Sequence, residues 1–288
     1  MRRGRRNEWL VTLPSFGWLS AFFLVPTLIV FAFALRPPDP FGGVAPGWTT
    51  ETLLGILDSQ YAAIVWRTAW LSLLTTALCM LLATPAGYAI ARAAPRARAR
   101  LMLLVIVPFW TSFLIRIFAW KVLLHPEGSL KQVLAFAGLV QPQAPLLYTP
   151  GAVLLVMVYA FLPFAILPIY AAAEKFDFRL LEAARDLGAG RLRAFVAVFL
   201  PGIQRGLLTA FLVVFIPALG SYVIPDLVGG PSGEMLGNKI AQRVFVDRNL
   251  PHASGLAAGL ILAVTLPMLA VFVLKRREGP APIIEEDA

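Results

Sequence analysis

The stretch Leu181-Glu182-Ala183-Ala184-Arg185-Asp186-Leu187-Gly188, followed after eleven intervening residues by Leu200-Pro201, lies in the longest polar interval of a very apolar chain. Leu, Glu, Ala and Arg all favour helix, and the earlier Asp177 can cap the start of one. Gly188 tolerates the left-handed backbone that ends many helices. The stretch therefore predicts a short helix whose two alanines and glycine leave a thin surface for another protein to approach. Pro201 then marks where the chain turns into the next apolar run.

The composition sets the class of protein. The 288 residues are 59% hydrophobic and 14% charged, whereas about a quarter of residues are charged in a soluble domain. The chain is therefore predicted to be an all-α polytopic membrane protein. A net charge of +9 would suit nucleic acid, but the basic residues gather at the ends of apolar runs, as membrane topology requires. Cys79 is the single cysteine and lies inside an apolar run, so we expect no disulfide and no metal site.

Hydropathy divides the chain into three parts. Residues 1–8 form a basic segment, residues 9–275 a membrane domain with a polar loop at 174–205, and residues 276–288 a tail with a disordered acidic end. The predicted spans are 9–35, 68–91, 101–124, 151–173, 206–225 and 253–274. A cleaved signal peptide is the alternative for the first span, but its uncharged run exceeds the roughly 7–15 residues of a signal core. An amphipathic helix is expected outside the membrane over 234–248.

The distribution of basic residues predicts the orientation. Seventeen of the 25 Lys and Arg residues fall in the segment 1–8, in the linker after the second span, in the loop 174–205 and in the run Lys275-Arg276-Arg277 after the last span. Because cytoplasmic loops are enriched in Lys and Arg, both termini and the loop 174–205 are predicted to be cytoplasmic.

The motif in this loop also resembles a known family. The spacing of Glu182, Ala183, Ala184 and Gly188 with Leu200-Pro201 resembles the coupling loop of permease subunits of binding-protein-dependent ABC importers. The stretches 107–116 (VPFWTSFLIR) and 222–230 (YVIPDLVGG) are similar to the first permease subunit of bacterial spermidine/putrescine importers. The resemblance implies a six-helix, type I ABC importer permease fold. It also implies that the motif residues form a coupling helix that docks on an ATPase.

The resemblance further implies the partners and the location. They are a dimer of cytoplasmic ABC ATPases, a second permease subunit that is a different chain, an extracytoplasmic substrate-binding protein and membrane lipid, in the bacterial cytoplasmic (inner) membrane. The sequence itself contains no Gly-x-x-x-x-Gly-Lys-Ser/Thr phosphate loop. We therefore expect a non-enzymatic chain without a cofactor, and ATP and Mg²⁺ bound by the partner ATPase.

The transported solute remains open at this point. The resemblance implies spermidine or putrescine, but the same machine could carry another small polar solute such as thiamine, iron or sulfate. An ion-coupled secondary transporter is the alternative from a different class; the coupling motif and the lack of acidic residues deep within a span argue against it. A membrane-embedded enzyme would need a motif such as Gly-x-Ser-x-Gly or His-Glu-x-x-His, which the sequence lacks.

Four residues are candidates for the substrate path: Trp110, Arg116, Tyr222 and Asp226. Carboxylates and aromatic faces attract a cationic solute, and a charge inside a span often faces a cavity or a partner charge. Each has an ordinary alternative. Arg116 can extend to the membrane interface, Asp226 can cap a turn, and Trp110 and Tyr222 can be packing aromatics.

Overall fold

The computed structural model describes residues 12–56, 59–141 and 143–277. Within them the regular structure is helical, apart from one isolated bridge between Pro38 and Val44. Four helices are long and apolar enough to cross a membrane: Thr12–Ala34, Tyr61–Arg92, Pro150–Glu174 and Leu250–Leu269. Two bent helix pairs raise this to as many as six. The basic segment 1–8 and the acidic end of the tail lie outside the described residues.

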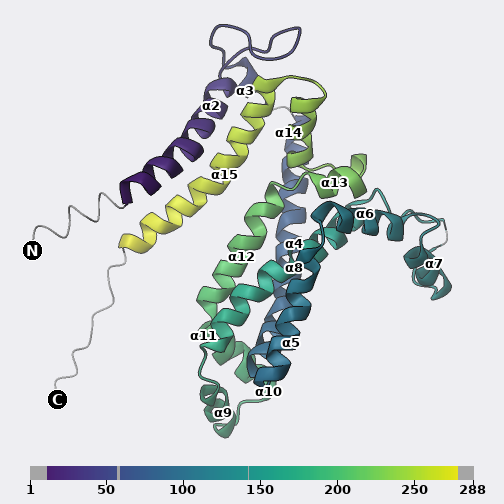
Figure 1. Ribbon diagram of the computed structural model, residues 1–288, viewed down its shortest axis with the longest axis vertical. Coiled ribbons are helices and arrows are strands. Elements are labelled where there is room, and N and C mark those ends of the chain that lie inside the picture. Colours follow the sequence, from purple (N-terminus) through teal and green to yellow (C-terminus); the bar gives the residue numbers. More distant parts are fainter. Residues whose placement is uncertain (1–11, 57–58, 142, 278–288) are drawn as a thin grey trace, which may run out of the picture. The chain divides into compact units, whose positions relative to one another are not determined.

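The chain forms two compact units, Met1–Tyr61 with Ile240–Ala288 and Ala62–Lys239. In the first unit, α15 (Leu250–Arg277) packs against α2 (Val25–Ala34) and α3 (Glu51–Ile56) (Figure 1). A π-helical turn, η1 (Ser20–Leu24), precedes α2. The first and last helices of the chain are thus brought together.

The second unit is built on three long helices: α4 (Ser59–Arg92), α8 (Pro150–Glu174) and α12 (Gln204–Leu219). α8 and α12 approach closely because Gly206 has no side chain: a Cβ there would overlap Ala172 and lie 2.9 Å from the carbonyl oxygen of Pro168. Small residues allow such approach between membrane helices. Pro163 and Pro168 lie inside α8 and Pro217 inside α12, and each helix continues through its prolines.

The span predicted over 101–124 is not one straight helix. It is divided into α5 (Pro95–Ile106), the 3₁₀ turn η2 (Val107–Trp110) and α6 (Phe113–Leu124), and α7 (Ser129–Phe136) follows. The segments Pro95–Trp110 and Phe113–Phe136 meet at 90°. At the break Thr111 and Ser112 are extended, with ψ 147° and 136°, values that neither an α-helix nor a 3₁₀-helix accommodates.

The span predicted over 206–225 also differs. α12 ends at Leu219, and a separate short helix, α13 (Val223–Val228), follows, with the 3₁₀ turn η4 (Pro231–Gly233) after it. The amphipathic helix predicted over 234–248 is present as α14 (Leu236–Phe245). α13 contacts α6 at the end of this unit opposite the loop 174–205 (Figure 1).

Candidate functional site

The predicted motif helix is α9 (Arg179–Asp186). Asp177 Oδ1 accepts hydrogen bonds from the backbone N–H of Arg179 at 3.0 Å and from Arg179 Nε at 3.1 Å. These hydrogen bonds lower the pKa of the Asp177 carboxyl below its ordinary value. The first turn carries Glu182 and the last turn Arg185, which suits the helix dipole. Asp177 thus accepts the first N–H of α9 from one residue before the N-cap position, which Phe178 occupies without a side-chain hydrogen bond.

The end of α9 depends on Gly188. Its φ of +89° lies in the left-handed region, where residues with a Cβ are strained. Gly188 N–H donates to the Arg185 carbonyl at 2.9 Å, and Ala189 N–H donates to the Ala184 carbonyl at 3.0 Å. This pair of bonds is the Schellman arrangement that satisfies the last carbonyls of a helix.

α9 is attached to the unit by one side and exposed on the other. Leu181 is buried in the core, and burial of a leucine side chain contributes about 1.5–3 kcal/mol. Glu182 and Ala183 are exposed and Ala184 is half-buried. Leu187 is 90% exposed and Leu192 76% exposed. The helix therefore presents short side chains flanked by large apolar ones, a surface that suits a protein partner.

An aromatic cluster ties the loop to the membrane helices. Tyr88 of α4 packs edge-on against Phe178 (5.8 Å between ring centroids) and Phe199 (5.0 Å). Phe176 packs edge-on against both phenylalanines, at 5.5 and 5.2 Å. Phe195 contacts Tyr88 at 5.4 Å. This cluster was not predicted from the sequence, although the four phenylalanines close to the motif were a signal for it.

Leu200 and Pro201 lie at a bend that joins the loop to α12. The short helix α10 (Arg191–Ala194) runs into the π-helical turn η3 (Phe195–Phe199) and then α11 (Leu200–Gly202). Leu200 N–H bonds the Phe195 carbonyl. Pro201 has no N–H and cannot continue an ordinary α ladder. The segments Arg191–Gly202 and Gln204–Leu219 then meet at 74°, so the chain turns where Pro201 predicted a turn.

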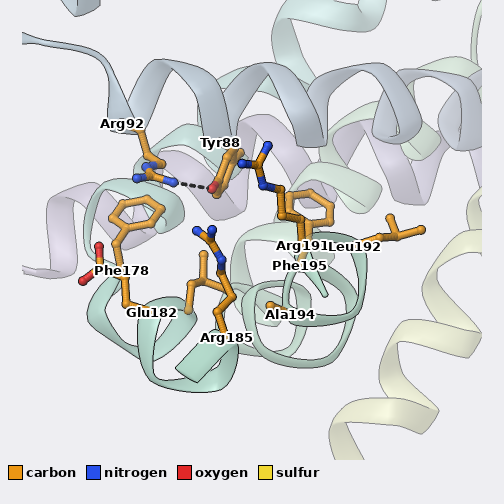
Figure 2. A pocket seen from close by; sticks show the side chains of 10 residues that line it. Tyr88, Arg92, Phe178, Glu182, Arg185, Arg191, Leu192, Ala194 and Phe195 are labelled. Atoms are coloured by element: carbon orange, nitrogen blue, oxygen red, sulfur yellow. Dashed lines mark hydrogen bonds between the residues drawn. The ribbon is translucent and has the colours of Figure 1, made fainter. Parts of the chain in front are cut away.

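A cavity of about 560 Å³ opens between α9, α10 and the end of α4. It is lined by residues of three kinds, aromatic, apolar and charged: Tyr88, Phe178, Phe195, Leu181, Leu192, Ala194, Arg92, Arg185, Arg191 and Glu182. Arg92 Nη1 donates to the Tyr88 hydroxyl at 2.7 Å (Figure 2). The site therefore combines the exposed helix α9 with a basic, aromatic-walled cavity beside it.

The four path candidates lie toward the other end of the unit. Trp110 at the end of η2 is 76% exposed and Tyr222 before α13 is 49% exposed. Asp226 is exposed on α13. The guanidinium carbon of Arg116 on α6 lies 5.4 Å from the ring centroid of Phe109 and 5.8 Å from that of Phe113. α6 and α13 are in contact, yet no ion pair of Arg116 occurs in residues 12–56, 59–141 and 143–277.

Comparison with known proteins decides the family. The family described as "binding-protein-dependent transport system inner membrane component" matches residues 83–280. This chain belongs to that family. The permease contains its motif loop within the matched range, and its family is one of transporter subunits located in the inner membrane. The predicted membership is confirmed.

Relatives and solved structures agree with this membership. The permease is 38% identical over 261 residues to the spermidine/putrescine transport system permease protein PotB of Haemophilus influenzae, covering 91% of this chain and 90% of that protein. PotB of Escherichia coli is 32% identical over 260 residues, covering 90% of this chain and 94% of PotB. The E. coli inner membrane ABC transporter permease protein YdcU is 29% identical over 272 residues, covering 90% of this chain and 86% of YdcU.

The fold prediction is also confirmed. A chain of a bacterial alginate ABC transporter, solved in complex with an alginate pentasaccharide-bound periplasmic protein, superimposes with a TM-score of 0.66 at 19% identity. The match covers 96% of this chain and 98% of that chain. At this identity the likeness concerns the fold alone, and that fold is the type I ABC importer permease.

Proposed function

We propose that this permease is one of two membrane subunits of an ABC importer that carries polyamines into the cell. Two relatives named as spermidine/putrescine permeases align over at least 90% of this chain. The stretches 107–116 and 222–230 carry the same resemblance. The second subunit is a different chain, and an extracytoplasmic binding protein delivers the solute to the α6 and α13 end.

The coupling step is assigned to α9. Its residues Glu182, Ala183 and Ala184 present the docking surface to a cytoplasmic ATPase dimer, which binds ATP and Mg²⁺. Gly188, Leu200 and Pro201 set where the docking helix ends and where the chain bends toward α12. The observation that carries this proposal is the exposed, capped α9 joined to α4 through the rings of Tyr88 and Phe178. Such a connection lets a movement of the partner rotate packed helices as a body.

The path candidates divide by charge. Asp226 offers a carboxylate and Trp110 and Tyr222 offer exposed aromatic faces, all of which attract ammonium groups. Arg116 carries the same sign as a polyamine, and its guanidinium lies against two phenylalanine rings. We therefore assign Arg116 to stabilising the bend between α5 and α6, and the other three to the path.

The test is uptake by proteoliposomes that hold this permease with the other permease, the ATPase and the binding protein of its transporter. Labelled putrescine and spermidine are supplied beside thiamine and sulfate. Polyamine uptake that requires ATP and the binding protein is the expected result. Uptake of another solute would retain the coupling assignment and overturn the cargo. Uptake that ignores ATP and follows an ion gradient would overturn the role of α9.

A further inference from the structure

Three arginines converge on the cavity beside the docking helix. Arg92 is the last residue of α4, Arg185 lies in the last turn of α9 and Arg191 begins α10. All three line the same cavity of about 560 Å³. Figure 2 shows their guanidinium groups gathered around the Tyr88 hydroxyl, with the Glu182 carboxylate apart from them. Three separate helices, α4, α9 and α10, thus each place a positively charged side chain at the same cavity.

No ion pair joins these three arginines to an acidic residue within the described part of the chain, although Glu182 lines the same cavity. Neighbouring arginines are paired: Arg98 binds Glu174 at 2.7 Å and Arg179 binds Asp177 at 3.1 Å. The ion pairs of the described residues include none with Arg92, Arg185 or Arg191. Like charges held together repel, so an arrangement that gathers three cations in one cavity favours an anion between them.

The residues that line the cavity indicate which kind of anion it would bind. A guanidinium presents paired N–H donors that match the oxygens of a phosphate. Tyr88 accepts a hydrogen bond from Arg92 at 2.7 Å and keeps its own O–H to donate. Apart from Glu182, the remaining walls are apolar, and they include Phe178, Phe195 and the 76% exposed Leu192. Arg92 ends a candidate membrane span, which places the cavity at the level where lipid headgroups lie.

From this geometry we propose that the cavity formed by Arg92, Arg185, Arg191 and Tyr88 binds a phosphate group. Two sources supply that chemistry: the headgroup of an anionic phospholipid and a soluble phosphate compound. Basic pockets beside membrane helices bind anionic headgroups through the same contacts. A phosphate here bridges the end of α4, α9 and α10, and so stiffens the docking helix against the membrane domain.

The experiment uses the full-length purified permease and the variants Arg191→Gln and Arg92→Gln, neither of which alters α9. Arg193→Gln is the matched control, because Arg193 also lies on α10 and is exposed but does not line the cavity. In one arm, phosphatidylglycerol or phosphatidylcholine is added to delipidated protein and bound lipid is counted by native mass spectrometry. In the other, inorganic phosphate is titrated at fixed ionic strength and thermal stability is measured.

We expect the permease to bind a phosphate group, and we expect this binding to depend on the arginines of the cavity. Loss of one guanidinium should weaken binding roughly tenfold, as for a charge-assisted hydrogen bond, while Arg193→Gln binds as the unaltered protein does. Selective binding of phosphatidylglycerol alone identifies the lipid source. Stabilisation by inorganic phosphate identifies the soluble source.

Two results would overturn the proposal. Equal weakening in Arg191→Gln and Arg193→Gln would show that the probes respond to general surface charge. Binding of neither probe, together with weaker ATPase capture by Arg191→Gln alone, would show that a carboxylate of the partner protein occupies the cavity. Neither readout requires transport, so failure here is distinguishable from failure of the proposed function.

Discussion

At the scale of single residues, the end of α9 depends on one backbone conformation. Gly188 has φ +89° and open space around it, so a side chain there is strained by the backbone and not by a neighbour. Gly188→Ala should cost about 1–2 kcal/mol in the last turn of α9. We expect normal membrane insertion and reduced ATPase capture in a co-purification assay. Gly190→Ala is the control: Gly190 has φ −64° and equally open space, and its variant should capture the ATPase normally.

The cap at Asp177 makes a prediction about pH. Hydrogen bonds from the side chain and backbone of Arg179 lower the pKa of the Asp177 carboxyl from its ordinary value of 3.8. Its contribution to stability is therefore complete above that ordinary value and is lost as pH falls through the lower folded value. The difference in melting temperature between the unaltered protein and Asp177→Asn should be constant from about pH 5 to pH 8 and should shrink only in stronger acid. A difference that changed near neutral pH would contradict this role.

At the scale of helices, the sequence indicated some features and concealed others. The short helix α9, its cap at Asp177 and its end at Gly188 followed from residues 177–188, because capping and termination are local. The 90° break between α5 and α6 did not follow. Hydropathy measures the length of an apolar run and not its direction, and the run continues across Thr111 and Ser112. The extended backbone at these two residues has no counterpart in the hydropathy pattern.

The cavity and the aromatic cluster were hidden for a related reason. Tyr88 and Phe178 lie 5.8 Å apart between ring centroids, yet the two predicted spans 101–124 and 151–173 separate them in the sequence. Contacts at such separation depend on how helices pack, which no local pattern records. The arginines that line the cavity were counted at sequence level only as topology signals, because each one alone satisfied the distribution expected of a cytoplasmic segment.

Close packing of α8 and α12 leads to a second prediction at this scale. Inside a helix, replacing glycine with alanine normally stabilises the helix by about 1 kcal/mol. At Gly206 the added Cβ would overlap Ala172 of α8, and overpacking of this kind costs about 1–3 kcal/mol. Gly206→Ala should therefore lower the melting temperature of the detergent-solubilised permease. Gly259→Ala, at an exposed helical position with nothing within 4 Å of its Cβ, should leave it unchanged or raise it.

At the scale of the whole molecule, the proposed orientation follows from where charges and surfaces lie in the second unit. α9 and its arginines lie at one end and α6, α7 and α13 at the other (Figure 1). If α9 meets an ATPase, it must be cytoplasmic, and α7 must then face outward. Cys79 is the only cysteine and is fully buried, so cysteines introduced at the surface can report topology without background.

The corresponding test compares Ala183→Cys on α9 with Ser129→Cys on α7, both exposed positions. A membrane-impermeant maleimide added to intact spheroplasts should label Ser129→Cys and spare Ala183→Cys. In inside-out vesicles the pattern should reverse, because the same two surfaces exchange access to the reagent. The unaltered permease, whose Cys79 is buried, should stay unlabelled in both. If Ala183→Cys were labelled from outside, α9 could not reach a cytoplasmic ATPase. This result would overturn the proposed coupling role of α9, whichever solute the permease carries.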